Sequence, residues 1–206
     1  MKKARKRKYK QKPFIILFLI LVVIGISVWY FFFREQPITV TVISEIDGYS
    51  YHLNSNETRL YKKYYKELEK ELKDSKVDEE NYAKLISKLF IIDFYTLTNK
   101  LTNRDIGGIE FIHSNLQEQF TNEASSTIYK YLKNNLSGSR KQRLPEVNKV
   151  DIKSIGKISY NNKDYKDDSG YRVVIDINYN KDYGYPKEQT LYIIHEDNKL
   201  SIVEVE

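Results

Sequence analysis

The chain has 206 residues, no cysteine and a formal net charge of +6. The lack of cysteine excludes disulfides, thiol nucleophiles and cysteine metal sites. Residues 1–34 hold nine of the 34 Lys and Arg and none of the 28 Asp and Glu, so residues 35–206 carry 25 basic and 28 acidic side chains, a formal charge of −3. This later part is not basic, and we expect no nucleic-acid binding there.

Residues 14–33 form an unbroken run of twenty uncharged, mostly apolar residues. A helix of that length, at ~1.5 Å rise per residue, spans the ~30 Å hydrocarbon core of a bilayer. Eight Lys and Arg precede it, and the positive-inside rule places such a segment in the cytoplasm. The pattern predicts a basic cytoplasmic tail over 1–13 and a transmembrane signal anchor over 14–33, with Trp29 and Tyr30 at the outer membrane interface.

A cleaved signal peptide is the alternative for this segment. Its apolar region would run for ~7–15 residues and end at a small-x-small cleavage site. Here the run is longer and ends in the bulky residues Trp29 to Phe33, which favours an uncleaved anchor. The basic tail then orients the span and meets anionic lipid of the inner leaflet. Nucleic-acid contact is the alternative role of that tail.

A juxtamembrane segment is predicted over residues 34–55. Apolar residues alternate with threonine from Ile38 to Val42, which indicates a strand. Asp47-Gly48 marks a turn, and alternation resumes from Tyr49 to Leu53. The segment therefore predicts a short hairpin.

Three helices are predicted next. Apolar residues recur at helical spacing from Leu60 to Leu72, which predicts a helix over 56–73. Asp78 is a suitable N-cap for a second helix over residues 82–98, which begins amphipathic and becomes apolar on nearly every face from Phe90 to Leu97, as in a buried central helix. Apolar residues at every fourth position from Leu116 to Leu132 predict a third helix over 114–135.

Four strands follow in a row, over about 150–160, 171–179, 191–194 and 200–205. Each shows apolar residues at a spacing of two, and short polar turns separate the strands. Short connections predict an antiparallel meander, and the helices can cover one of its faces. The fold class predicted is α+β: one N-terminal transmembrane helix, followed by three helices packed on a curved four-stranded antiparallel sheet. The extracytoplasmic cone-like domain covers residues 56–206.

This order of elements resembles the nuclear-transport-factor-2-like fold, or cystatin-like cone, over roughly residues 57–206. The apolar helix Tyr82–Asn99, with Phe94–Thr98 at its end, is similar to the long helix of that fold, and residues 111–120 resemble its second helical segment. The basic tail, single span and outer domain together resemble the bitopic scaffold subunit of type IV secretion and conjugation machines. That resemblance implies a non-catalytic domain that self-associates or contacts other channel subunits.

Asp93 is the candidate pocket residue, because it lies among Phe90, Ile91, Ile92, Phe94 and Tyr95. The cone fold implies one use for it, since ketosteroid isomerase has a general base carboxylate inside the cone. A buried carboxylate would have a raised pKa and could exchange protons near neutrality. The alternative is an aspartate on a polar strip of the helix or one bonded to a backbone amide. No second catalytic partner stands out.

The remaining polar motifs predict no catalytic set, no cofactor and no metal site. His52, His113 and His195 are far apart and lack metal-binding spacing. Asp105–Gly108 lacks the lysine of a phosphate loop, so we interpret it as a turn.

Candidate partner contacts lie in two turns. Tyr183 and Tyr185 flank Gly184 and have less reason than other tyrosines to face the core. The short loop with Arg140, Lys141 and Arg143 is either a solvated turn or a contact with an acidic partner or lipid headgroups.

The sequence thus favours a non-enzymatic, single-pass protein of the cell membrane, with a cytoplasmic N-terminus and an extracytoplasmic domain. Its expected partners are membrane lipid and other membrane or surface proteins, with a second copy of the chain as one candidate. A secretion or conjugative transfer complex is the most concrete setting. The alternative is an outer small-molecule-binding or weakly catalytic cone domain centred on Asp93.

Overall fold

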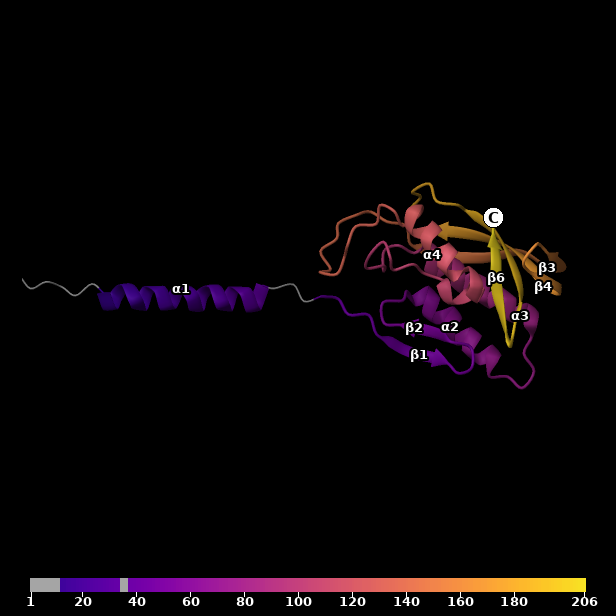
Figure 1. Ribbon diagram of the computed structural model, residues 1–206, viewed down its shortest axis with the longest axis horizontal. Helices are drawn as coiled ribbons and strands as arrows, with labels where there is room; N and C mark the ends of the chain where they lie inside the picture. Colours follow the sequence, from indigo (N-terminus) through magenta and orange to yellow (C-terminus); the bar gives the residue numbers. More distant parts are fainter. Residues whose placement is uncertain (1–11, 34–36) are drawn as a thin grey trace, which may run out of the picture. The chain divides into compact units, whose positions relative to one another are not determined.

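A computed structural model describes residues 12–33 and 37–206, with side chains of the first helix described for residues 15–31. The chain divides into two units, residues 1–37 and 38–206. Helix α1, Lys12–Phe33, belongs to the first unit (Figure 1). Over the described residues, no helix combines the length and the apolar character needed to cross a membrane. The predicted basic tail lies outside the described residues, apart from the backbone of residues 12 and 13.

The second unit opens with the predicted β-hairpin, although its first strand begins later than the alternation suggests. Strands β1, Val42–Ile46, and β2, Tyr51–Asn54, are antiparallel. Gly48 has a φ of +82° in the connecting turn, a conformation that glycine adopts without strain. Three hairpin side chains are buried in the main core: Ile46, Tyr51 and Leu53. The hairpin therefore belongs to the folded unit that begins at residue 38.

Helices α2, Arg59–Leu72, and α3, Glu79–Tyr95, confirm the first two predicted helices, although α2 begins three residues later and α3 ends three residues earlier than predicted. The Thr58 hydroxyl accepts from Tyr61 N and caps α2, and the Asp78 carboxylate accepts from two backbone N–H groups and caps α3. Eleven of the 17 residues of α3 are buried. The prediction of a buried central helix is confirmed.

The third predicted helix is much shorter than the apolar spacing indicated. The chain forms two short 3₁₀ turns, η1 (Ile109–Phe111) and η2 (Ser114–Leu116), and then α4 (Gln117–Ser126). The prediction of helix to residue 135 is wrong. The hydroxyls of Ser125, Ser126 and Thr127 bond to carbonyls three or four residues back, and this local pairing competes with the helix.

Tyr129 then holds the chain in a non-helical path. Its side chain is fully buried, and its hydroxyl donates to Phe94 O at 2.7 Å and accepts from Gly107 N at 3.1 Å. These bonds to distant segments have no counterpart in the local spacing of apolar residues, which is why the spacing alone overstates the helix.

The predicted meander of four strands is confirmed. Strands β3 (Val147–Asn161), β4 (Lys166–Tyr179), β5 (Glu188–Glu196) and β6 (Lys199–Val205) form one antiparallel sheet in the order β3-β4-β5-β6. Helix α3 packs on β3 and β4, and α2 packs on α3 (Figure 1). The ring of Phe120 in α4 packs in a tilted arrangement against Phe90 and Phe94 of α3. The second unit is thus an α+β domain.

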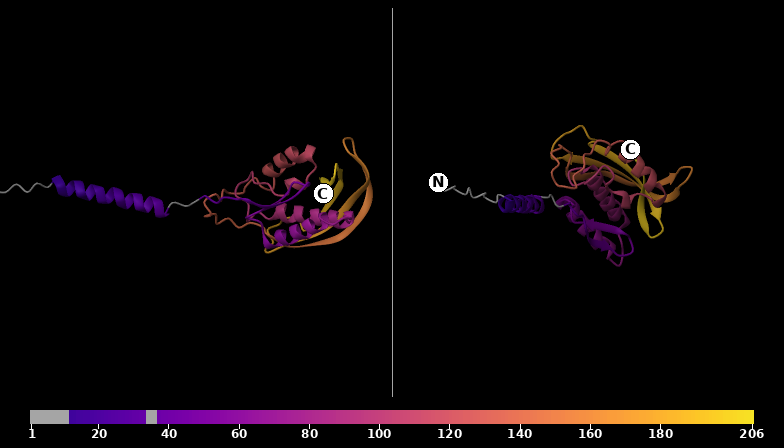
Figure 2. Two further views of the ribbon diagram at one scale, coloured as in Figure 1. Left: turned by 90° about the horizontal axis from the view of Figure 1, so that it is seen from below. Right: turned by 60° about the vertical axis from the view of Figure 1, so that its left-hand side comes forward.

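The long strands β3 and β4 curve strongly (Figure 2), and their far end reaches across the outer face of the sheet. The Tyr160 hydroxyl donates to Glu204 of β6 at 2.8 Å, and the Tyr165 ring lies 4.6 Å from the ring of His113. Gly170 marks the bend, because a Cβ there would lie 2.7 Å from the carbonyl oxygen of Ile193. Only glycine allows this close approach of two backbones.

Candidate functional site

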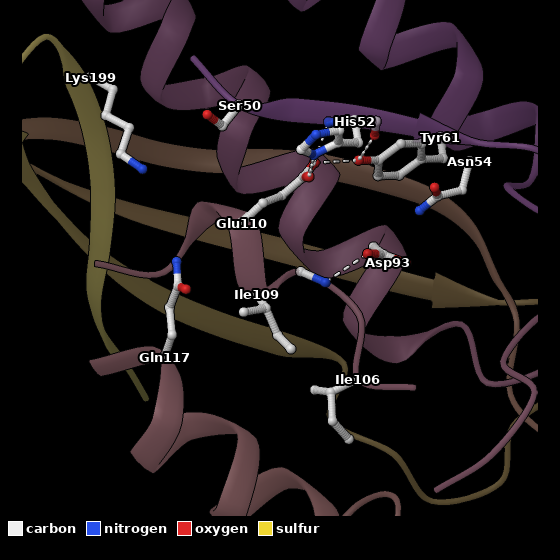
Figure 3. A pocket seen from close by; sticks show the side chains of 11 residues that line it. Ser50, His52, Asn54, Tyr61, Asp93, Ile106, Ile109, Glu110, Gln117 and Lys199 are labelled. Atoms are coloured by element: carbon white, nitrogen blue, oxygen red, sulfur yellow. Dashed lines mark hydrogen bonds and ion pairs between the residues drawn. The ribbon is translucent and has the colours of Figure 1, made fainter. Parts of the chain in front are cut away.

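A polar pocket of about 360 Å³ opens beside the hairpin, where β2, α2, α3, η1 and the start of α4 meet. Figure 3 shows Glu110, His52 and Tyr61 gathered on one side and Asp93 on another. Eight of the lining residues carry polar side chains: Ser50, His52, Asn54, Tyr61, Asp93, Glu110, Gln117 and Lys199. The pocket brings together segments that are up to about 150 residues apart in sequence.

Asp93, the residue singled out in the sequence, lies at this pocket. Its side chain is 13% exposed and forms an ion pair with Lys100. Its second carboxylate oxygen accepts a hydrogen bond of 2.6 Å from Gly108 N. Both oxygens are therefore held by the chain itself, which matches the alternative of a carboxylate bonded to a backbone amide.

The turn over residues 105–108 is built around this carboxylate. A Cβ on Gly107 would collide with the backbone carbonyl of Asp93, and Gly108 has a φ of +76°. Glycine is the residue that meets both demands. The double glycine thus lets the chain approach the end of α3 closely enough for Gly108 N to reach Asp93.

Lys100 is a buried cation that the sequence analysis did not identify. Its side chain is 3% exposed. Burial lowers the pKa of Lys100, but the nearby carboxylates of Asp93 and Glu57 offset this and hold the pKa above its ordinary value. Lys100 therefore remains charged in the folded domain.

Glu57 is a second carboxyl group near the same ammonium. It is 8% exposed, and the side-chain amide of Asn99 donates to it at 3.3 Å. Burial, followed by repulsion from the Asp93 carboxylate, raises the pKa of Glu57 to about 8. The Lys100 ammonium therefore lies near two carboxyl groups, Asp93 and Glu57, and Glu57 keeps its proton near neutral pH.

Glu110 is the carboxyl group with the most direct access to the pocket, with a side chain that is 22% exposed. It accepts from His52 N at 3.0 Å and from the Tyr61 hydroxyl at 3.1 Å, and the His52 Nδ1 lies 3.2 Å away. Burial raises the pKa of Glu110 to about 7, although the bond from His52 N opposes this. A carboxyl group with this pKa can give or take a proton near neutrality.

The three histidines lie in separate places. His52 contacts Glu110, His113 packs against the tilted ring of Tyr165, and His195 contacts Asp167 at 2.7 Å. In the ranges that the structure describes, no group of three or more His, Cys, Asp or Glu is arranged to hold a metal ion.

Two of the candidate partner contacts, Arg140 and Tyr185, instead make contacts within the domain. The Arg140 guanidinium donates to the carbonyl oxygens of Leu97, Thr98, Lys100 and Lys133 at 2.8–3.1 Å. Tyr185 is half-buried and packs near Tyr179. Tyr183, by contrast, is 37% exposed, and Lys141 and Arg143 are also exposed.

Trp29 and Tyr30, the predicted interface residues, lie in the last turns of α1. Their side chains are 63% and 53% exposed, respectively.

The sequence did not indicate Glu57, Lys100 or Glu110 as site residues, and it did not place His52 or Tyr61 at the pocket. Glu110 carried a weak signal, since it is a single charge among Ile109, Phe111 and Ile112. Lys100 lies next to Leu101 in an ordinary polar stretch and carried none. A comparison with protein-family models, curated proteins and solved structures finds no match to this chain.

Proposed function

We propose that this chain is a single-pass membrane protein whose outer domain binds other proteins at the membrane surface. The packed interior of the domain carries the proposal. Phe90 of α3 and Val173 and Leu191 of the sheet are all 0% exposed, so side chains fill the layer between helix and sheet where a cone-type ligand would sit. The apolar run over 14–33 and the preceding basic tail support the anchor and its orientation.

In its most concrete form, the domain is a scaffold subunit of a secretion or conjugative transfer complex. The combination of a basic tail, an apolar span and an outer domain supports this version, because it resembles the bitopic scaffold subunits. The exposed ring of Tyr183 supports a contact with another protein, since tyrosine is enriched at interfaces.

The absence of native cysteine allows a direct test of the orientation, because each introduced thiol is unique. Lys8→Cys and Ser139→Cys would be treated with a membrane-impermeant maleimide in intact cells. We expect labelling at position 139 only, and at both positions after permeabilisation. Labelling at position 8 in intact cells would overturn the orientation, and release of the domain into the medium would overturn the anchor.

A photo-crosslinking amino acid at Tyr183 would test the binding of proteins in the native membrane. We expect a discrete product heavier than the monomer, with a buried control at Val173 giving none. If exposed positions around the whole domain return only monomer, the proposed function is wrong.

The polar pocket supports a second candidate function, the binding of a small molecule or weak acid–base chemistry. The observation that favours it is Glu110, a pocket carboxyl group with a pKa of about 7. A small amine would place a cation between Glu110 and Asp93. We expect a panel of amines, but not carboxylic acids, to raise the unfolding temperature of the wild type and not of Glu110→Gln; equal effects on both proteins would exclude this use of the pocket.

A further inference from the structure

The free edge of the four-stranded sheet borders an apolar groove. Strand β6 is an edge strand, and a groove of about 280 Å³ runs between it and the η2–α4 segment. Leu116 and Phe120 line the helical side, and Val203 and Val205 line the strand side. Both walls present apolar side chains, and one of them is also a strand edge.

The backbone at Val205 faces this groove. Thr190 and Glu206 exchange both backbone hydrogen bonds, at 2.8 and 2.9 Å. In an antiparallel ladder the next pair does not exchange bonds, and its N–H and C=O groups point away from the partner strand. That next pair is Leu191 and Val205, so Val205 presents an N–H and a C=O toward the groove.

The chain already pairs with the first half of this edge. Ile112 forms a parallel bridge with Ile202, and His113 N donates to Ile202 O at 2.9 Å. The chain then leaves the edge as η2 and α4. Of the residues that the structure describes, no other segment forms a bridge along β6 on this side.

The charge of the groove lining indicates which kind of partner would bind there. Glu123 of α4 and Glu204 of β6 line the groove, and its lining includes no basic side chain. A second copy of this chain would bring Glu204 and Glu206 of one β6 close to those of the other, and like charges facing each other across paired strands are destabilising. Anionic lipid is also disfavoured, because the carboxylates of Glu123 and Glu204 would repel its headgroups.

We propose that this groove binds a short extended segment of a partner protein, which pairs with the backbone of Val205, places apolar side chains against Phe120 and Leu116, and sets Lys or Arg opposite Glu123 and Glu204. This is strand addition at a sheet edge, with main-chain bonds for affinity and side chains for selection. The inference deepens the proposed protein-binding function and rests on it. The contact is short, since a register irregularity at Val203 limits ladder pairing to Val205.

The test uses the full chain in zwitterionic nanodiscs and a fluorescent peptide with the sequence Gly-Lys-Val-Lys-Val-Lys-Gly, read by anisotropy. A peptide with Glu in place of Lys is the charge control, and empty nanodiscs control for lipid binding. We expect saturable binding of the Lys peptide and at least tenfold weaker binding of the Glu peptide.

Val205→Pro removes the N–H that faces the groove and leaves the β5 ladder intact, because Val205 belongs to a pair that exchanges no bonds. Val205→Ala loses the same packing but keeps the N–H. We expect Val205→Pro to bind the Lys peptide about tenfold more weakly than Val205→Ala. Equal affinity of the two variants for the Lys peptide would contradict the backbone pairing. A dimer of the full chain that Val205→Pro disrupts, and that the peptide does not displace, would also contradict it.

A second pair of variants keeps the proposal falsifiable if Val205→Pro unfolds. Glu123→Lys reverses a groove charge, whereas Glu118→Lys makes the same change at an exposed position of α4 outside the groove lining. We expect Glu123→Lys to weaken the Lys peptide at least fivefold and to favour the Glu peptide, with less than a twofold change for Glu118→Lys. Equal effects overturn the charge selection. If crosslinking at Tyr183 yields a partner but the Lys peptide does not bind, this inference fails and the proposed function stands.

Discussion

Asp93 and Lys100 form a buried ion pair at the end of helix α3, with side chains only 13% and 3% exposed. Removal of one partner leaves an uncompensated charge in the interior, which costs about 3–5 kcal/mol. We therefore expect Lys100→Met to lower the free energy of unfolding by that amount, measured by urea denaturation of the full chain in detergent.

The double variant Asp93→Asn with Lys100→Met removes both charges and should recover much of the loss. Lys153→Met is the control, because Lys153 pairs with Glu188 on the exposed surface, where ion pairs contribute little. A loss in Lys100→Met no larger than that in the control would show that the pair is not important for stability.

The stability of the domain should depend on pH through Glu57 and Glu110. Burial comes first among the causes that raise their pKa values, to about 8 and about 7 respectively, whereas glutamate in an unfolded chain has a pKa of about 4.3. The folded chain therefore binds more protons than the unfolded chain above that value. The stability that these two groups contribute is fully present below about pH 4.3 and is lost as the pH rises toward 8.

The slope should approach about 1.4 kcal/mol per pH unit for each group protonated only in the folded chain. Glu57→Gln should reduce the dependence of the free energy of unfolding on pH up to about pH 8, and Glu110→Gln should reduce it up to about pH 7. Unfolding titrations between pH 5 and pH 9 measure both, with the exposed Glu67→Gln as control. Stability that rises across this window in the wild type would contradict the assignment.

Gly170 should not tolerate alanine. The added Cβ would lie 2.7 Å from Ile193 O, and the obstacle is backbone, which cannot move aside easily. We expect Gly170→Ala to lose about 2–4 kcal/mol of stability. Gly156 lies in the neighbouring strand with no atom within 4 Å of the site of a Cβ, so Gly156→Ala should leave the thermal unfolding midpoint nearly unchanged. Similar midpoints for both variants would show that β4 can bend without this approach.

Arg140 and Arg143 lie in one loop but should behave differently. Arg140 donates to four backbone carbonyls, whereas Arg143 is exposed. We expect Arg140→Ala to lose about 2 kcal/mol and to speed hydrogen exchange over residues 133–145. Arg143→Ala should change neither measurement. Equal exchange rates in the two variants would contradict a structural role for Arg140.

Much of the fold could be predicted because its signals are local. The cap at Asp78, the apolar faces of α2 and α3 and the alternation in β4 each depend on neighbours within a few residues. The third helix was overstated because Tyr129 is held by Phe94 and Gly107, which are 35 and 22 residues away in sequence.

The candidate site could be predicted only in part. Asp93 stood out as a charge in an apolar helix. Its pairing with Lys100 and the proximity of Glu57 arise because the chain turns back after α3 and α2 packs beside it. Glu110 reaches His52 across 58 positions, a distance over which spacing in the sequence carries no information.

The hydroxyl of Tyr51, in the first hairpin, donates to Leu200 O at 3.3 Å, in the last strand. The fully buried ring of Tyr51 thus depends on a residue made 149 positions later. During synthesis the hairpin is complete long before strand β6, which contacts Tyr51. The domain therefore cannot complete its fold until β6 has left the ribosome. Contacts of such long range slow folding, and a product that stops before residue 200 would expose the aromatic core to other chains.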